Sequence, residues 1–517
     1  MKNILQMLEM SSKKYPNKII FGDVKDEIKY AEFTKKAKII GAQIASKYKK
    51  RKCPIVIFID KTINCLSSMM GVLYSGNFYS ILDTTSPKER AENILNTLEP
   101  ICIITDNKNI TKLKKLDLSC KEIFNIDEIE SNLETEDVIE NILQNIRNEQ
   151  IDTDAAYILF TSGSTGKPKG TVVSHKAVIS YTNWVEEAFK IDENTIWGSQ
   201  TPFYFSMSIT DVFSCIKSGG SLYIIPKMYF SFPVRLIEFL NEKKINSIYW
   251  VPSALSIVAN LGALKEAKLP YLKCILFAGE VMPTKQLNMW RKKLPNVMFA
   301  NLYGPTETTD ICSYYILNRE FKDDESIPIG INCDNCNLII LKEDGTEAKR
   351  KINGSGEYIG ESDMGELLVR GSFLASGYYK DIERTQKAFI QNPINNEYPE
   401  IVYKTGDLVK YNEAGELIYL GRKDFQIKHM GYRIELGEIE KAFYGINEIS
   451  CAICLYDDKK DNIVLIYQGK IEEKDLAIKI KDKLLGYMLP NKYIKLEKIP
   501  YNSNGKIDRK KLKELIQ

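Results

Sequence analysis

Short apolar runs alternate with helix-length segments through the first three hundred residues of the chain. Eight of these runs are apolar enough to be buried strands, at 54–59, 78–82, 101–105, 155–160, 221–225, 247–251, 274–277 and 297–301. Helix-length segments lie between them, for example at 87–98, 234–244 and 284–293. This alternation predicts an α/β fold in which mostly parallel sheets are covered by helices.

The pattern changes near residue 327. Four short strand-like runs follow, at 337–341, 365–370, 407–411 and 416–420, with a hairpin-like turn at 412–415. After residue 424 the pattern is mixed again, with helical segments at 435–444 and 474–485 and strand-like segments at 449–455 and 462–468. We therefore expect a β-rich subdomain and then a small α+β unit.

These changes divide the chain into two expected domains. Residues 1–421 form a large N-terminal body that ends in the β-rich subdomain (about 327–421), and residues 422–517 form a small C-terminal unit. The charged stretch 106–150 is expected to be a surface excursion. No low-complexity linker separates the halves, so a hinge between them has to be short.

Composition limits the possible functions. The 517 residues are 44% hydrophobic and 27% charged, as in ordinary globular proteins, and 71 basic against 68 acidic residues argue against a nucleic-acid binder. No run reaches the roughly 18–20 apolar residues of a membrane span, and residues 1–14 lack the apolar core of a signal peptide. The eleven cysteines, an odd and scattered set, fit reduced thiols. We expect a cytoplasmic protein without a membrane span.

Histidine is nearly absent, which limits the chemistry. Only His175 and His429 are present, so the catalytic groups have to be lysines, carboxylates, hydroxyls and backbone donors. We expect His175 to cap or pack the start of a helix and His429 to be exposed in a loop. The short cysteine pairs 333/336 and 451/454 lack the nearby histidine that would favour zinc.

Residues 160–170 carry the most informative motif. After a buried strand they supply three glycines, four hydroxyls and two lysines in eleven residues, a composition suited to binding phosphate. The segment is not an ordinary P-loop, because Pro168 follows Lys167 where that motif needs Ser or Thr. The candidate phosphate-binding residues are Thr161, Ser162, Gly163, Ser164, Thr165, Gly166, Lys167 and Lys169.

Together with four later motifs, this loop resembles the adenylate-forming superfamily, which includes nonribosomal-peptide adenylation domains, acyl- and aryl-CoA ligases and luciferases. The later motifs lie at 301–309, 403–407, 421–433 and 504–508, in the family's order. The resemblance implies that an acid is activated with ATP and Mg²⁺ as an acyl-adenylate, with release of pyrophosphate. It implies a large body and a mobile C-terminal domain.

The same resemblance assigns roles around the nucleotide. Tyr303 would contact adenine, Asp407 the ribose hydroxyls and Arg422 the sugar or phosphate region. Glu307 would bind Mg²⁺, and one of the two neighbouring hydroxyls, those of Thr306 and Thr308, would lie near the α-phosphate. Glu307 and Thr306 are counted as catalytic and Thr308 as nucleotide-binding.

The C-terminal motifs supply the remaining machinery. Lys506 is the expected catalytic cation, in an Asn-Gly-Lys turn near the end of the chain. Asp424 falls at the hinge position. Lys428 and Gly431 would lie on the loop presented during thioester formation.

Residues 201–211 align with the block that receives the acid. In relatives that activate α-amino acids, the position of Ser206 is normally Asp, which pairs with the substrate ammonium. Serine cannot supply that charge, so a non-standard or β-amino acid is expected. Asp310 would then bind a β-amino group, or an α-amino group approached from another side; the alternative is that Asp310 is hydrogen-bonded within the protein or points to solvent. The expected pocket residues are Phe205, Ser206, Met207, Thr210, Tyr249, Leu276, Ala278, Leu302, Asp310 and Ile311.

Within the superfamily, the chain most resembles the D-alanine–carrier protein ligases, on segments 181–184, 277–283 and 486–490. The resemblance implies that the partner is a separate acyl or peptidyl carrier protein bearing phosphopantetheine, an expectation that the end of the chain at Gln517, soon after the last motif, also favours. An aryl- or acyl-CoA ligase using the same adenylate intermediate is the alternative. A non-catalytic scaffold is disfavoured by the intact Lys506, Asp407 and Glu307.

Overall fold

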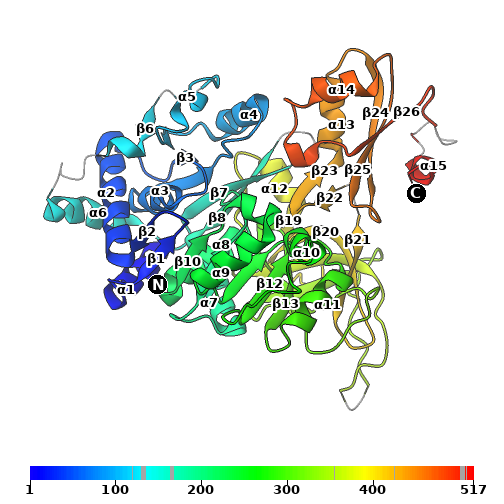
Figure 1. Ribbon diagram of the computed structural model, residues 1–517, viewed down its shortest axis with the longest axis horizontal. Coiled ribbons are helices and arrows are strands. Elements are labelled where there is room, and N and C mark those ends of the chain that lie inside the picture. Colours follow the sequence, from blue (N-terminus) through cyan, green and yellow to red (C-terminus); the bar gives the residue numbers. More distant parts are fainter. Residues whose placement is uncertain are drawn as a thin grey trace.

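The computed structural model describes residues 1–118, 120, 122–129, 135–162, 168–353, 356–423, 426–500, 507 and 509–516, without the side chain of Lys510. A large α/β body occupies most of the molecule, and the C-terminal elements gather at one corner of it, beside β20 and β21 (Figure 1).

A seven-stranded sheet contains most strands of the first third of the chain, in the order β18-β8-β7-β4-β3-β5-β6. Neighbouring strands from β7 to β6 in this order are parallel, whereas β8 is antiparallel to both β7 and β18. The strands are β3 (Pro54–Phe58), β4 (Phe78–Ile81), β5 (Cys102–Thr105), β6 (Ile123–Asn125), β7 (Ala155–Thr161), β8 (Lys169–Ser174) and β18 (Gly377–Tyr378).

A nine-stranded sheet follows, in the order β15-β14-β13-β12-β11-β9-β10-β1-β2. Its six central strands are parallel, and the antiparallel strands lie at its two ends. The strands are β1 (Ile19–Gly22), β2 (Glu27–Lys29), β9 (Ile196–Ser199), β10 (Ser221–Ile224), β11 (Ser247–Trp250), β12 (Cys274–Ala278), β13 (Met298–Tyr303), β14 (Ser313–Ile316) and β15 (Ile331–Asn332).

Helices pack closely around these sheets. At the contact of α2 with α3, a Cβ on Gly41 would lie 2.4 Å from Tyr74, and one on Gly71 would lie 2.4 Å from Ile40, so both positions require glycine. The α-helices of the body are α1 (Ile4–Lys14), α2 (Tyr30–Tyr48), α3 (Ile63–Tyr74), α4 (Lys88–Leu98), α5 (Ile110–Leu113), α6 (Glu136–Glu149), α7 (His175–Phe189), α8 (Ser208–Ser218), α9 (Pro233–Glu242), α10 (Pro252–Asn260), α11 (Thr284–Lys293) and α12 (Ile382–Ala388). Three 3₁₀ turns accompany them, η1 (Ile126–Glu128), η2 (Lys227–Ser231) and η3 (Thr306–Thr308).

The expected β-rich subdomain is an antiparallel five-stranded sheet in which β21 pairs with β20 beside the path β16-β17-β20-β19. Its strands are β16 (Cys336–Leu341), β17 (Gly365–Gly371), β19 (Phe389–Gln391), β20 (Ile401–Tyr411) and β21 (Leu417–Arg422).

The C-terminal unit consists of a hairpin, a three-stranded sheet and short helices. Its residues from Ile434 to Met488 form a hydrophobic core separate from the main core of the body. The elements are β22 (Gln426–His429), β23 (Tyr432–Glu435), α13 (Leu436–Tyr444), β24 (Ile449–Asp457), β25 (Asn462–Gly469), α14 (Glu473–Ile480), η4 (Gly486–Met488), β26 (Lys492–Lys495) and α15 (Arg509–Glu514).

This architecture confirms the expected α/β class, with mostly parallel sheets, a β-rich subdomain and a small α+β unit. All eight strands expected in the first three hundred residues are present, as β3, β4, β5, β7, β10, β11, β12 and β13. Among the helices of the described residues, none has the length and apolar character needed to cross a bilayer.

Two expectations about elements were wrong. The stretch 106–150 is not only a surface excursion: β6 extends the seven-stranded sheet beside β5, and α6 buries Leu143 and Ile146 against the body. The last long helix, α14, ends at Ile480 rather than near 485, because the chain turns there and continues into η4.

Candidate active site

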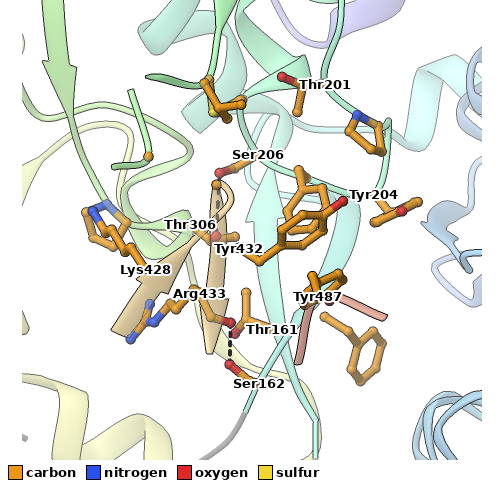
Figure 2. Close-up of a pocket in the computed structure, with 18 of the residues that line it drawn as sticks. Thr161, Ser162, Thr201, Tyr204, Ser206, Thr306, Lys428, Tyr432, Arg433 and Tyr487 are labelled. Carbon is orange, nitrogen blue, oxygen red and sulfur yellow. Dashed lines mark hydrogen bonds between the residues drawn. The ribbon is translucent and has the colours of Figure 1, made fainter. Parts of the chain in front are cut away.

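One cavity lies where the carboxyl ends of the parallel strands meet the hairpin β22–β23, as is usual for ligand sites of open α/β sheets (Figure 2). It joins residues from motifs that are far apart in the sequence. Those from the predicted set are Thr161, Ser162, Phe205, Ser206, Met207, Ala278, Thr306, Asp310, Ile311, Asp407, Arg422, Lys428 and Gly431.

The predicted phosphate loop connects the antiparallel strands β7 and β8, which pair Thr161 with Lys169 at its base. Thr161 and Ser162 face the cavity, and the Ser162 hydroxyl donates a hydrogen bond of 2.6 Å to the Arg433 carbonyl. Lys169 is buried, and burial lowers the pKa of its ammonium group to about 8. The loop residues Gly163, Ser164, Thr165, Gly166 and Lys167 lie outside the described residues.

Glu307 is fully buried in η3 and is surrounded by positive charge. Its Oε1 accepts hydrogen bonds from Lys169 Nζ at 3.0 Å and the Tyr378 hydroxyl at 2.7 Å, and its Oε2 accepts one from Arg433 at 2.8 Å. Burial alone would raise the pKa of this carboxyl, but Arg433 and Lys169 hold it well below its usual range. Glu307 is therefore an ionised carboxylate at neutral pH.

The predicted ribose and adenine residues form a second connected group. The Tyr303 hydroxyl donates to Asp407 Oδ2, and Arg422 donates to Asp407 Oδ1 at 2.8 Å. Lys428 places its ammonium group 4.9 Å from the centre of the Tyr303 ring, so the hairpin covers the aromatic face expected to contact adenine. Thr308 is buried beneath this surface and donates to the Pro305 carbonyl at 2.8 Å.

The predicted acid pocket divides into a lining and a layer behind it. Phe205, Ser206, Met207, Ala278, Asp310 and Ile311 line the cavity. Thr210, Tyr249, Leu276 and Leu302 are buried and do not line it. Of these four, Thr210 and Tyr249 act through Asp310, to which both donate hydrogen bonds.

Several residues of the site were not predicted. Arg433 was noted only as part of its loop, and its bond to Glu307 spans 126 positions of the sequence. Tyr181, which reaches Asp310 from α7, gave no chemical signal in its own segment. Tyr432 stacks on Tyr487 with ring centres 3.4 Å apart.

The hairpin is docked firmly on the body. The Tyr432 ring meets Phe205 edge to face at 4.7 Å, and Arg90 of α4 forms an ion pair of 2.5 Å with Glu438 of α13. At the tip, a Cβ on Gly431, whose φ is +80°, would lie 2.5 Å from Val251. Glycine is therefore required where the tip contacts the cavity wall.

The histidines contrast with each other. His175 is buried at the start of α7, as expected of a packing residue, and burial lowers the pKa of its imidazole to about 4. The expectation that His429 is exposed was wrong: its ring is buried against Tyr456, and its Nδ1 lies 3.1 Å from Asp461 Oδ1. The predicted hinge residue Asp424 and the predicted catalytic residue Lys506 lie outside the described residues.

Comparison with known families gives one match that covers most of the chain. The family described as AMP-binding enzyme matches residues 8–379. Two curated relatives carry the name D-alanine–D-alanyl carrier protein ligase. The one from Bacillus cereus is 29% identical over 528 residues, covering 98% of each chain, and the one from Staphylococcus aureus is 28% identical over 529 residues, covering 100% of each.

Solved structures share the fold at lower identity. A Vibrio cholerae adenylation domain in complex with glycyl-adenosine-5′-phosphate superposes with a TM-score of 0.82 at 21% identity, covering 99% of this chain and 98% of that one. An amide bond synthetase from Marinactinospora thermotolerans superposes with a TM-score of 0.85 at 15% identity, covering 99% of each chain.

Proposed function

The chain belongs to the AMP-binding enzyme family, and from that membership we propose that it activates a small carboxylic acid with ATP and transfers the acyl group to the phosphopantetheine thiol of a separate carrier protein. The observation that carries this proposal is the continuous cavity. Its wall includes Ser162 of the phosphate loop, Asp407 of the nucleotide motifs and Asp310 of the acid pocket.

The first step joins two anions. A carboxylate oxygen of the acid attacks the α-phosphorus of ATP, the new P–O bond forms, and the bond to the β-phosphate breaks to release pyrophosphate. The site therefore has to supply positive charge and oriented donors. Arg422 and the Ser162 hydroxyl lie on the cavity wall for this purpose, and Lys506 is the proposed mobile cation that stabilises the developing charge.

Mg²⁺ is the proposed metal, and Glu307 is its proposed protein ligand, provided that Arg433 moves away. In the described part of the chain, no cluster of three or more His, Cys, Asp or Glu side chains could hold a metal alone. Mg²⁺ commonly takes one or two carboxylates and completes its shell with phosphates and water, where it neutralises phosphate charge. Glu307 Oε2 fits this role once Arg433 moves away from it.

The second step attacks the acyl-adenylate. The thiolate sulfur bonds to the acyl carbon, the carbon–oxygen bond to AMP breaks, and AMP leaves. We propose that the pantetheine arm enters beside Gly431, where the missing side chain leaves backbone at the cavity wall. The carrier as acceptor is supported by the names of the two curated relatives.

The two steps also require a division of the chain, which we place between residues 421 and 422, with the hinge at Asp424. The separate hydrophobic core of the C-terminal unit supports this division. We place the enzyme in the cytoplasm, where ATP is available and where its eleven cysteines, all free, stay reduced.

The test is ATP–pyrophosphate exchange with the full chain across amino, β-amino, aliphatic and aryl acids. The accepted acid is then offered with a pantetheinylated carrier or with coenzyme A. We expect exchange with an amino acid and acylation of the carrier alone. Acylation of coenzyme A in preference to the carrier would establish the CoA-ligase alternative, and no exchange with any acid would overturn the proposed function.

A further inference from the structure

Asp310 is a buried carboxylate aimed into the acid pocket. It follows η3, is 1% exposed, and nevertheless contributes to the cavity wall. The preceding residue, Thr309, has φ of +67°, a conformation that a β-branched residue rarely adopts. The Asp310 amide donates to the Thr308 carbonyl at 2.8 Å and closes this tight turn. The backbone therefore holds Asp310 in a fixed direction at a strained position.

Three hydroxyl groups hold one oxygen of this carboxylate. Asp310 Oδ2 accepts from Thr210 at 2.7 Å and from Tyr181 and Tyr249 at 3.1 Å each. Tyr181 also lies 2.7 Å from the Thr210 hydroxyl; since each hydroxyl carries one hydrogen, this contact alternates with one of their two bonds to Oδ2. A carboxylate has about four acceptor positions on its two oxygens. Oδ1 therefore keeps acceptor capacity for a further donor.

The charge of Asp310 has no cationic partner among the described residues. The cations on the cavity wall are placed elsewhere: Arg422 pairs with Asp407, Arg433 with Glu307 and Arg90 with Glu438, and Lys428 lies over the Tyr303 ring. The wall around Asp310 is largely apolar and includes Met207, Val251, Ala278 and Ile311. A buried carboxylate in such a wall is costly to ionise unless a cation joins it. Since the described part of the chain pairs no cation with Asp310, we infer that the ligand supplies it.

Ser206 indicates how far the cation lies from the reacting carboxyl group. The Ser206 hydroxyl is 3.5 Å from that of Thr306, a predicted catalytic residue (Figure 2). Ser206 also lowers the pKa of the Asp310 carboxyl and so favours its ionised form. Ser206 thus stands between the expected reaction centre and Asp310. A cation that reaches Asp310 has to sit farther from the carboxyl group than one paired with a carboxylate at position 206.

Resting on the proposed function, we propose that Asp310 binds the ammonium group of the acid substrate and that this substrate is a β-amino acid. The ammonium contacts Oδ1, and the three hydroxyls fix Oδ2. Asp310 is a specificity-determining residue and takes no part in bond making.

Two pairs of isomers that differ only in the position of the amino group test where the ammonium group binds. ATP–pyrophosphate exchange is measured with 3-aminobutanoate, 2-aminobutanoate and butanoate, and in parallel with β-alanine, alanine and propanoate. We expect kcat/KM to be at least about 100-fold higher for each β-amino acid than for its deaminated counterpart, because the buried carboxylate would otherwise lack its partner. The isosteric Asp310→Asn substitution should remove this preference and leave the KM for ATP unchanged.

Two further variants keep the test decisive if Asp310→Asn is unstable. The double variant Ser206→Asp/Asp310→Asn moves the carboxylate toward the reaction centre and should shift preference to 2-aminobutanoate. Asp26→Asn, in an exposed turn, is the matched control and should behave as wild type. Preference for an α-amino acid by the wild type, or exchange with uncharged acids alone, overturns this inference and leaves adenylate formation standing. Absence of exchange with every acid overturns the proposed function itself.

Discussion

Glu307 and Asp310 are carboxylates three residues apart on one loop, yet their surroundings shift their pKa values in opposite directions. Both are buried, and burial raises the pKa of each. At Glu307 this effect is outweighed by Arg433 and Lys169. At Asp310 only hydroxyl groups oppose it, so burial raises its pKa to about 6. Glu307 therefore carries a constant charge at physiological pH, and the charge of Asp310 depends on pH.

A pH profile follows for the free enzyme. Ammonium binding requires ionised Asp310, and protonation removes that charge as pH falls through about 6. We expect kcat/KM for 3-aminobutanoate to fall toward lower pH, approaching about tenfold per unit well below the pKa. The measurement is pyrophosphate exchange between pH 5 and 8. Asp310→Asn should lack this inflection; the same inflection in that variant would assign it to another group.

Lys506→Ala tests the proposed catalytic cation. Loss of a charge that acts on the transition state should lower adenylation about 10²–10³-fold, with little change in the KM for ATP. The measurement is pyrophosphate exchange at saturating acid. Lys498→Ala, an exposed lysine in the same part of the chain, serves as the control. Near-normal exchange by Lys506→Ala would remove this residue from the mechanism.

At this scale the sequence predicts residues whose chemistry is visible in a local motif. Glu307, Asp407 and Arg422 were predicted from motifs that resemble those of the adenylate-forming superfamily. The contacts of Arg433 with Glu307 and of Tyr181 with Asp310 were not predicted, because they form only after folding. His429 was misjudged because a polar loop predicts exposure, whereas Tyr456 buries this ring.

At the scale of elements, the hairpin β22–β23 occupies positions that the nucleotide complex needs. Its Arg433 lies on the Glu307 oxygen proposed for Mg²⁺, its Lys428 covers Tyr303, and its Arg433 carbonyl accepts from Ser162. Two cations of the hairpin, Arg433 and Lys428, thus lie near the positions proposed for Mg²⁺ and for the adenine ring. On the proposed roles of Glu307 and Tyr303, hairpin docking and binding of Mg²⁺–ATP would exclude each other, and we propose that the docked arrangement belongs to the step after pyrophosphate has left.

Arg433→Gln tests this exclusion. The variant loses the ion pair with Glu307 that holds the hairpin in place, so the KM for Mg²⁺–ATP in the exchange reaction should be unchanged or lower. Transfer to the carrier should slow by about tenfold or more, because removing one partner of a buried pair leaves the other charge unpaired. Exchange and single-turnover acylation measure the two steps separately. An equal loss in both would place Arg433 in adenylation itself.

The positions of strands were predicted correctly where the hydrophobic pattern was strong. The buried strands β3, β5 and β12 have continuous apolar runs, so their positions were predicted to within a residue or two. The short edge strand β6 and the helix α6 were missed, because their segment is rich in charge and buries only a few side chains. Edge elements need little apolar surface, and periodicity alone does not distinguish them from loops.

At the scale of the whole molecule, the body and the C-terminal unit meet across a polar and aromatic interface. The body and the C-terminal unit each bury their own apolar side chains. Between them, Phe205 contacts Tyr432, which stacks on Tyr487, and Arg90 pairs with Glu438. An interface of this kind can open without exposing either core, which is compatible with the proposed alternation of the C-terminal unit between two reactions.

Reversing the charges of the Arg90–Glu438 pair tests whether this interface serves the second reaction alone. Both side chains are nearly buried, so Arg90→Glu places two carboxylates together and opposes docking. In this variant, carrier acylation should slow about tenfold or more while pyrophosphate exchange stays near wild type. The double variant Arg90→Glu/Glu438→Arg should restore acylation, because it remakes the ion pair with opposite polarity. Lys380→Glu is the control. Lys380 forms an exposed ion pair with Glu99, the residue that follows α4, and its replacement should leave both steps unchanged. Loss of exchange in Arg90→Glu, or failure of the double variant to recover, would show that the docked arrangement is not specific to transfer.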